Sequence, residues 1–301
     1  MRIAVTGAGG RLGRAVAAAL AAAPFTGLAG PITWHRTDFD LDDPDDVGQL
    51  LDRDRVELVV HAAAWTDVDG CARDPALAMR RNGEATAVLA AAAAARGIDL
   101  ILISTNEVFD GTRSERAYLP NDPPAPANPY GASKLAGERG AMEVFARGTA
   151  GGSLGIARTA WLFGPGAPDF PTKIAHAARR AALAGEPLSV VGDEIGTPTY
   201  VADLGQAIAD IVESGDISGI RHLVNGGRAS RAAWARDVVA RLGIEAAIRD
   251  VAQATFSRAS SPPLWGVLEP TALPDGRVLR TWPDAMADYA PILRRSVKMR
   301  E

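Results

Sequence analysis

The chain has 301 residues, of which 47% are hydrophobic and 23% charged, a composition typical of a folded globular protein rather than a disordered one. This length is sufficient for one large α/β domain and a smaller second lobe. The formal net charge of −4 argues against nucleic acid or an anionic membrane as the main partner.

The only cysteine, Cys71, has no intrachain partner for a disulfide, which fits a reducing compartment, so we expect a cytoplasmic protein. Residues 15–23 are apolar, but they follow a glycine-rich turn and are better explained as a helix than as a signal peptide. Every other apolar run is shorter than the ~20 residues that span a bilayer, so no membrane association is expected.

Apolar strand-like runs alternate with alanine-rich helical stretches, the pattern of a parallel sheet with crossover helices. The expected strands lie at residues 2–6, 32–35, 58–62, 100–104 and 155–161, and the expected helices at 12–22 and 85–95. Beyond residue 164, a helix is expected at 173–184, short strands at 188–191 and 220–224, and a helix at 202–212; residues 252–274 suggest an ordered loop.

The pattern predicts an α/β fold, a Rossmann-type doubly wound parallel sheet with a smaller, interleaved C-terminal substrate lobe. Residues 1–163 would form the NAD(P)-binding domain, with returning segments near 188–225. Residues 164–301 would form mainly the substrate-binding lobe. The chain contains neither an internal repeat nor a low-complexity linker, so the two parts are expected to interleave.

A glycine-rich turn joins the first expected strand to the first expected helix. Gly7, Gly10 and Gly13 have GxxGxxG spacing, and Gly9 adds a fourth glycine. Such glycines permit a tight turn and a close approach of the backbone to a pyrophosphate, which the N-terminus of the following helix attracts. We therefore expect residues of this turn to bind a dinucleotide: Gly7, Gly9, Gly10, Arg11, Leu12 and Gly13.

The choice of cofactor is made near the end of the second strand. An acidic residue there would hold a ribose 2′-hydroxyl, whereas an arginine would accommodate a 2′-phosphate. This chain has Arg36 at that place and its first acidic residue only at Asp38. The pattern favours NADPH, with NADH as the alternative.

Tyr130 and Lys134 are four residues apart, which places both side chains on one face of a helix. A tyrosine has an ordinary pKa of about 10, and a neighbouring ammonium group favours its phenolate form. Thr105 ends an earlier strand and supplies a third hydrogen-bonding group for a substrate carbonyl. The three side chains together predict a proton-transfer site next to the cofactor.

Four scattered histidines, His35, His61, His176 and His222, lack the spacing of metal ligands, so no metal site is expected. His61 ends a strand beside the cofactor and is interpreted as a packed residue rather than a base. The acidic residues at 38–46 are interpreted as a loop with helix caps rather than a cation site.

Further segments carry recognisable motifs: HAAAWTDVD at 61–69, Asn82, STNEVFDG at 104–111, NPYGASKLAGE at 128–138, RTAW at 158–161, GDEIGTPT at 192–199, and Asp203. Taken with the glycine turn, they resemble the dTDP-4-dehydrorhamnose reductase family, a nucleotide-sugar branch of the extended short-chain dehydrogenase/reductases. The likeness covers most of the chain. Asp203 falls at a helix start in this family and is interpreted here as a cap.

The resemblance implies an NAD(P)H-dependent oxidoreductase that reduces the C4 ketone of a nucleotide-linked 4-keto-6-deoxy sugar. The expected reaction converts dTDP-4-dehydro-L-rhamnose to dTDP-L-rhamnose, a step of dTDP-rhamnose biosynthesis for cell-wall polysaccharide. Tyr130 would donate a proton to the forming alkoxide, and Thr105 would hydrogen-bond that oxygen. Lys134 would tune Tyr130 and hold the cofactor ribose.

By the same resemblance, Asp40 and Leu41 would flank the adenine, and Ala62, Ala63 and Ala64 would run beside the cofactor. The substrate side would comprise Thr105, Asn106, Glu107 and Trp161. Trp161 would lie against the sugar, although its size and position equally suit a core aromatic residue.

Three departures from the family pattern fall near the substrate or a subunit contact. Asn106 and Glu107 replace an aspartate and a tyrosine. Ala72 stands at an acidic position, and residues 259–263 lack the arginine that precedes a proline in the family. The cofactor motifs carry no such change, so the sequence supports hydride chemistry more firmly than it identifies the sugar.

Glu107 suggests a rival, because nucleotide-sugar 4,6-dehydratases carry Thr-Asp-Glu at this place. Their aspartic acid protonates the leaving hydroxyl, and the amide of Asn106 has no such proton to give. A reductase is therefore favoured, and another nucleotide-sugar epimerase, dehydratase or reductase is the alternative. A non-catalytic, cofactor-binding regulatory subunit is a minor alternative, because such a chain would not need Thr105, Tyr130 and Lys134 together. The sugar, the nucleotide and the oligomeric state are left open, with a homodimer as one option.

Overall fold

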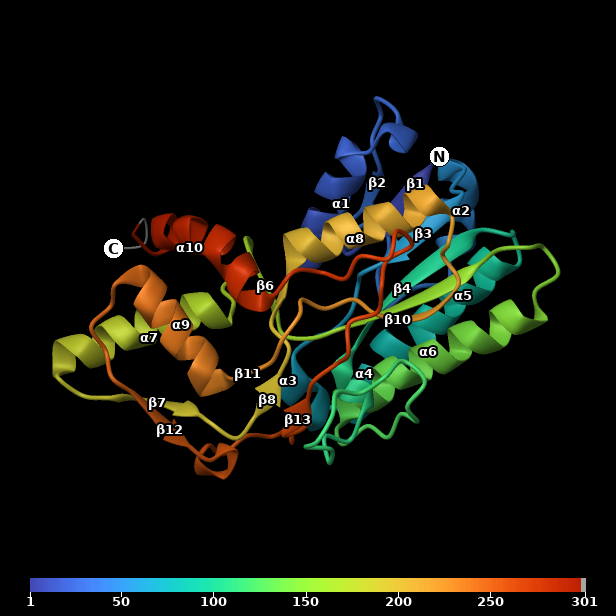
Figure 1. The fold of residues 1–301 in the computed structure, drawn as a ribbon. Helices are drawn as coiled ribbons and strands as arrows, with labels where there is room; N and C mark the ends of the chain where they lie inside the picture. Colours follow the sequence, from blue (N-terminus) through green and yellow to red (C-terminus); the bar gives the residue numbers. More distant parts are fainter. Residues whose placement is uncertain (299–301) are drawn as a thin grey trace.

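The computed structural model describes residues 1–298 and has a six-stranded parallel sheet at its centre (Figure 1). The strand order is β10-β5-β4-β3-β1-β2. After β1 the chain adds β2 on one side and then β3 on the other, so the order in which strands are added reverses between β1 and β3. The strands of this sheet are β1 (Ile3–Thr6), β2 (Ile32–Trp34), β3 (Leu58–His61), β4 (Asp99–Thr105), β5 (Leu154–Thr159) and β10 (Gly219–His222). In open α/β sheets, ligands bind outside the carboxyl ends of the strands at such a switch point.

Ten helices appear in the described part of the chain. They are α1 (Arg11–Ala22), α2 (Val47–Asp54), α3 (Val68–Arg73), α4 (Pro75–Ala78), α5 (Ala85–Ala94), α6 (Pro129–Arg147), α7 (Phe170–Ala184), α8 (Val201–Ser214), α9 (Arg231–Leu242) and α10 (Trp282–Lys298). A π-helical segment, η2 (Met79–Glu84), joins α4 to α5.

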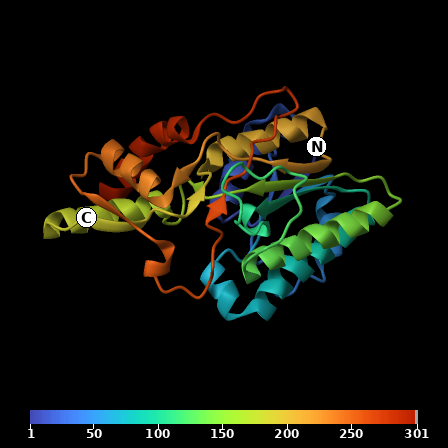
Figure 2. The same ribbon diagram turned by 60° about the horizontal axis from the view of Figure 1, so that its bottom comes forward.

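Alternate strand residues point to opposite faces of the sheet, and each face has its own helical cover. Val60 and Ile101 pack in one apolar cluster with α1 and α8, whereas Val59 and Leu100 pack in another with α2, α5 and α6. Figure 2 shows the two layers of helices on either side of the sheet. Because both faces are covered, the strands are continuous apolar runs, and the doubly wound fold expected from the sequence is confirmed.

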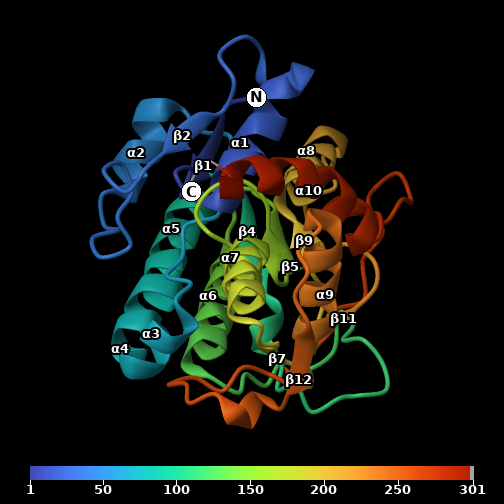
Figure 3. The same ribbon diagram turned by 90° about the vertical axis from the view of Figure 1, so that its left-hand side faces the viewer.

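A smaller lobe of helices α7, α9 and α10 lies beside the large sheet, in front of it in Figure 3. Its core contains Phe163, Ile174, Trp234 and Tyr289. Short strands complete it: β6 (Leu162–Phe163), β7 (Leu188–Val191), β8 (Ile195–Gly196), β9 (Thr199–Tyr200), β11 (Ala229–Ser230), β12 (Ile248–Val251) and β13 (Trp265–Gly266). Between its parts the chain returns to the large sheet through α8 and β10, whereas β7 pairs with β12 in the smaller lobe.

Within the described residues, no helix combines the length and apolar character required to cross a membrane.

Two expectations about local structure were wrong. The strand expected at residues 155–161 ends at Thr159, because Trp161 adopts a left-handed backbone with φ of 44°. Asp203 does not cap its helix. The N-cap of α8 is Tyr200, and the Asp203 carboxylate instead accepts hydrogen bonds from Arg280 and Asn225. Asp203 therefore ties the start of α8 to the segment that precedes α10.

Candidate active site

The turn between β1 and α1 is closed by the glycines that the sequence singled out. Gly7 has a φ of 63°, and its carbonyl accepts a hydrogen bond from the Gly10 amide at 2.8 Å. A Cβ atom on Gly13 would lie 2.2 Å from the Gly7 oxygen, a distance no side chain tolerates. The turn thus brings the N-terminus of α1, which has no side-chain cap, against the carboxyl end of the sheet.

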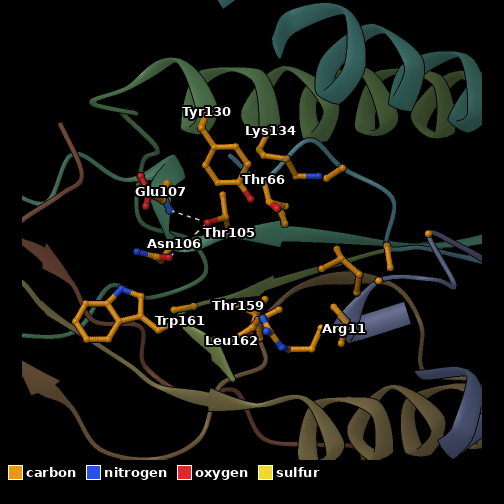
Figure 4. A pocket seen from close by; sticks show the side chains of 18 of the residues that line it. Arg11, Thr66, Thr105, Asn106, Glu107, Tyr130, Lys134, Thr159, Trp161 and Leu162 are labelled. Atoms are coloured by element: carbon orange, nitrogen blue, oxygen red, sulfur yellow. Dashed lines mark hydrogen bonds between the residues drawn. The ribbon is translucent and has the colours of Figure 1, made fainter. Parts of the chain in front are cut away.

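A cavity of about 430 Å³ opens at the carboxyl ends of β1, β3, β4 and β5 (Figure 4). It brings together most of the residues expected at the site. Those lining it are Gly7, Gly10, Arg11, Leu12, Gly13, Ala62, Ala64, Thr105, Asn106, Glu107, Tyr130, Lys134 and Trp161. Thr66, Val68, Ser104, Thr159 and Leu162 also line it and were not expected there.

A second cavity of about 280 Å³ shares the wall formed by Gly7, Gly10, Ala62 and Ala64 with the first. It also contains the remaining residues expected near the adenosine half of a dinucleotide, namely Arg36, Asp40, Leu41 and Ala63. Phe39, Trp65 and Arg81 complete its lining. Gly9 lines neither cavity: a Cβ there would approach the side chain of His35.

Two buried hydroxyl groups support the fit of a nicotinamide cofactor between these cavities. The side-chain oxygens of Ser104 and Thr159 are buried, line the larger cavity and have no hydrogen-bond partner among the described residues. Buried polar atoms are rarely left unpaired, so such atoms indicate a polar ligand. Together with the glycine turn, they make the residues present suitable for a dinucleotide.

Arg11 was expected to bind the dinucleotide, but its guanidinium group points to backbone carbonyls of a neighbouring loop. Its guanidinium donates hydrogen bonds to the carbonyls of Gly164 and Ala167, the former at 3.1 Å. The side chain therefore ties the start of α1 to the loop that enters the smaller lobe, while its stem lines the cavity (Figure 4).

The first turn of α6 is held directly against the end of β4. The Asn128 side chain caps the helix by accepting from the Gly131 amide at 2.9 Å. A Cβ on Gly131 would lie only 1.9 Å from the backbone oxygen of Glu107. This backbone contact fixes the distance between α6 and the end of β4, and it therefore places Tyr130 next to Thr105.

A buried ion pair holds the next part of α6 to β5. The Arg158 guanidinium donates to both carboxylate oxygens of Glu138, at 3.0 and 2.6 Å, and to the Pro120 carbonyl at 3.1 Å. Both side chains are almost completely buried. Because the pair is bidentate and well enclosed, it fixes the orientation of α6 on the sheet.

Tyr130 points from α6 toward Thr105 (Figure 4). Burial raises the pKa of Tyr130 well above its usual range, the negative charge of Glu107 adds to this, and the neighbouring Thr105 hydroxyl opposes it. The sequence predicted a pKa lowered by Lys134. The actual direction is opposite, because desolvation favours the neutral phenol. Tyr130 is therefore a protonated acid at neutral pH.

Lys134 lies one turn further along α6 and is buried. Burial lowers its pKa to about 8, against an opposing contribution from the carboxylate of Glu138. The ammonium group is therefore poised to lose its proton just above neutral pH.

His61, also buried, is hydrogen-bonded to Thr6 at 2.8 Å and Thr86 at 3.2 Å. Its pKa is lowered to about 3, so it is a neutral, packed residue, as the sequence indicated.

Asn106 and Glu107, the two departures beside Thr105, are both enclosed. The Asn106 side-chain oxygen accepts from the Thr105 hydroxyl at 3.4 Å. The Asn128 amide donates to the Glu107 carboxylate, whose pKa is raised by burial. Sequence reasoning missed this partnership, since no local pattern relates residue 107 to the cap of α6.

Trp161 lies on the side of the cavity away from α6 (Figure 4) and also packs into the smaller lobe. Its ring stacks on Trp234 with centroids 5.9 Å apart, and the Arg231 guanidinium lies 3.5 Å from its centroid. Arg231 in turn is paired with Glu194 at 2.9 Å. This packing holds the tryptophan in a backbone conformation that a bulky residue rarely adopts. Trp161 therefore packs with the core of the smaller lobe and also lines the cavity, and its contact with a sugar stays a prediction.

Among the residues that the structure describes, no group of three or more histidine, cysteine, aspartate or glutamate side chains is placed to hold a metal ion.

Comparison with known proteins identifies the family. Residues 1–294 match the model of the RmlD substrate binding domain. The chain belongs to this family. A dTDP-4-dehydrorhamnose reductase of Mycobacterium tuberculosis is 34% identical over 293 residues, 95% of this chain and 91% of the relative. The resemblance to the dTDP-4-dehydrorhamnose reductase family is thereby confirmed.

Two further relatives bear on the chemistry. A dTDP-4-keto-6-deoxy-D-glucose reductase of Streptomyces niveus is 33% identical over 294 residues, 96% of each chain. The crystal structure of a dTDP-4-dehydrorhamnose reductase from Bacillus anthracis, in complex with NADP, superimposes with a TM-score of 0.85 and 29% identity, covering 96% of this chain and 98% of the other.

Replacing Gly131 by alanine tests the docking of α6. An exposed glycine-to-alanine change inside a helix would stabilise it by about 1 kcal/mol. Here the new Cβ meets the Glu107 carbonyl, so we expect a net loss of about 1–3 kcal/mol in the free energy of unfolding, measured by urea denaturation. Gly140→Ala on the same helix is the control, since its Cβ would meet the Cβ of Ala87 at 3.0 Å and the Cα at 3.7 Å but no backbone oxygen. Equal stability of the two variants would contradict the role assigned to Gly131.

Proposed function

We propose that this protein is an NADPH-dependent reductase of the C4 ketone of a nucleotide-linked 4-keto-6-deoxy sugar. The substrate that fits best is dTDP-4-dehydro-L-rhamnose, and the product dTDP-L-rhamnose. The observation that carries the proposal is a protonated Tyr130 that faces Thr105 in a cavity sharing a glycine-lined wall with a second, dinucleotide-sized cavity. Relatives over nearly the full length carry matching names.

The residues at the carboxyl edge of the sheet would hold the cofactor. The pyrophosphate would lie on the turn from Gly7 to Gly13 at the start of α1, and Lys134 would hold the ribose next to the nicotinamide. Ser104 and Thr159 offer unpaired hydroxyls near that end. Bound NADPH would supply the hydride that reduces the ketone carbon. The NADP bound to the Bacillus anthracis relative supports the choice of this cofactor.

Tyr130 and Thr105 would act on the carbonyl oxygen. Reduction of a ketone adds a hydride to carbon and a proton to oxygen, so the protein must deliver one proton from an acid within hydrogen-bonding distance. Burial keeps Tyr130 protonated until negative charge develops on the substrate oxygen. The Thr105 hydroxyl donates a second hydrogen bond to the same oxygen and stabilises that charge.

Lys134 would make this proton transfer possible. A buried phenolate is costly, and a nearby ammonium group lowers that cost once the proton has left Tyr130. The same charge attracts the ribose hydroxyls and the negatively charged cofactor. Both roles require the protonated form of Lys134, whose pKa is about 8.

Asn106, Glu107 and Trp161 would form the sugar side of the site. They line the cavity next to Thr105, and Trp161 offers a flat apolar wall suited to a sugar ring. Because Glu107 is an enclosed carboxyl group, the sugar would meet a group that accepts hydrogen bonds when ionised and donates one when protonated. A keto sugar that has not been epimerised, as the name of the Streptomyces relative suggests, is the second candidate substrate.

We propose the division of labour that the sequence suggested. Residues 1–163, with returning segments near 188–225, would bind NADPH, and residues 164–301 would contribute mainly to the substrate lobe.

The single cysteine, Cys71, is buried and its pKa is raised by burial to about 11, which suits a reducing cytoplasm. A homodimer stays a prediction.

The reaction is tested by following NADPH oxidation with freshly generated dTDP-4-keto-6-deoxyglucose, with and without a 3,5-epimerase. We expect oxidation that depends on the epimerase, because the product of that enzyme is the rhamnose-configured ketone. Oxidation without the epimerase would instead support the non-epimerised sugar. If neither mixture oxidises NADPH, the proposed substrate class is wrong.

Tyr130→Phe supplies the matched control. Its ring retains the packing but has no proton to donate, so turnover should fall by about 10²–10⁴-fold, the usual contribution of a positioned acid. NADPH binding, measured by fluorescence titration, should stay unchanged. Turnover within tenfold of the unmodified protein would overturn the assignment of Tyr130 as the proton donor.

The pH dependence of kcat/KM follows from Lys134. Its pKa is lowered to about 8, so it is charged below that pH and neutral above it. We expect activity and NADPH affinity to fall as the pH rises through about 8. Lys134→Arg keeps a positive charge at any accessible pH, so its residual activity should lack this fall. A profile that is flat to about pH 10, or an unchanged fall in the arginine variant, would show that another group titrates.

A further inference from the structure

Two arginines and one aspartate form a compact cluster at the wall of the smaller cavity. Arg36, after β2, and Arg81, in η2, both line this cavity, and both donate hydrogen bonds to the carboxylate of Asp42. Arg81 binds both oxygens of Asp42, each at 2.6 Å, and Arg36 reaches one of them at 2.9 Å. Two segments far apart in the sequence thus place two positive charges on one carboxylate.

Arg81 is the better positioned of the two cations. Its side chain is 23% exposed, compared with 72% for Arg36. Its guanidinium also lies 5.3 Å from the centroid of the Trp65 ring, which lines the same cavity. A guanidinium held by an aromatic face and a carboxylate loses little freedom when it binds a new anion.

The chemistry of the cluster matches that of a phosphate ester. Carboxylates and phosphates both accept the paired N–H groups of a guanidinium, so a group that binds one in this geometry also binds the other. The cavity extends from the dinucleotide turn to Arg36 after β2, the place at which an arginine accommodates the 2′-phosphate of a dinucleotide. Arg36 pairs with Asp40, at 3.2 Å, as well as with Asp42, whereas the hydrogen-bonded acid of Arg81 is Asp42.

We propose that Arg81, together with Arg36, binds the 2′-phosphate of NADPH, and that this phosphate displaces the carboxylate of Asp42 from the two guanidinium groups. Asp42 thereby sets the preference between NADPH and NADH. The inference rests on the proposed use of a nicotinamide cofactor. It adds Arg81 and Asp42, neither of which the sequence motifs indicate, to the residues that choose it.

Competition explains why one cluster would serve both cofactors. With NADH, Asp42 keeps both arginines paired, so the site carries no unbalanced charge near the ribose. With NADPH, the phosphate brings more negative charge than the carboxylate it replaces, and Asp42, which is 35% exposed, turns to water. The binding free energy of the phosphate is then the free energy of its contact with the guanidinium groups minus that of the Asp42 contact which it replaces.

The test measures binding without any sugar substrate. Dissociation constants are determined by calorimetry for 2′,5′-ADP and 5′-ADP, and by fluorescence for NADPH and NADH, in the full chain and in Arg81→Gln and Asp42→Asn. Arg73→Gln and Asp43→Asn are the matched controls, because both residues are exposed and neither lines the cavity.

We expect Arg81→Gln to weaken 2′,5′-ADP and NADPH about tenfold, the effect of one charge-assisted contact, and to change 5′-ADP and NADH by less than about twofold. Asp42→Asn should tighten 2′,5′-ADP and NADPH by about threefold or more, since the competing charge is gone. The controls should behave as the unmodified protein does.

Two results would overturn the inference. Equal losses for all four ligands in Arg81→Gln would make this residue a structural one. An unchanged or weakened affinity for 2′,5′-ADP in Asp42→Asn would mean that Asp42 positions the arginines instead of competing for them. These outcomes are independent of sugar reduction: if turnover of the keto sugar fails while the binding series holds, the proposed reaction falls and the phosphate site stands.

Discussion

The contact between the first turn of α6 and the end of β4 is the constraint on which the site depends. Gly131 lets the helix backbone touch the Glu107 carbonyl, and Asn128 both caps the helix and holds the Glu107 side chain. The ion pair between Arg158 and Glu138 prevents α6 from sliding or rotating on the sheet. Tyr130 and Thr105 thus come from different elements, yet their relative position is fixed by backbone packing rather than by flexible side chains.

The proposed cofactor half and the proposed substrate half of the cavity differ in how they are built. The cofactor half uses backbone: a glycine turn, a helix N-terminus and the strand ends at Ala62 and Ala64. The substrate half uses side chains that depend on one another, with Glu107 on Asn128 and Trp161 on Arg231. A side-chain wall can change identity without disturbing the fold, and one of the three departures from the family pattern, at Asn106 and Glu107, lies in it.

Much of this arrangement was predictable from sequence, because it rests on local patterns. The glycine spacing, the Tyr130–Lys134 pair and the apolar strand runs each describe a short stretch of chain whose geometry follows from its own residues. Features that depend on distant partners were not predictable. The pKa of Tyr130 rises because of burial and Glu107, Asp203 pairs with Arg280 instead of capping α8, and Arg81 meets Asp42 across 39 positions of the chain. No local pattern encodes these encounters.

The central claim is that Thr105, Tyr130 and Lys134 present the C4 carbonyl of a nucleotide-linked sugar to the reducing face of a nicotinamide. The most direct measurement uses NADPH carrying deuterium at both hydrogen positions of nicotinamide C4, with the epimerised 4-keto sugar as substrate. We expect one deuterium in the product, located at C4 of the sugar by nuclear magnetic resonance. A product without deuterium, or with deuterium at another carbon, would contradict it.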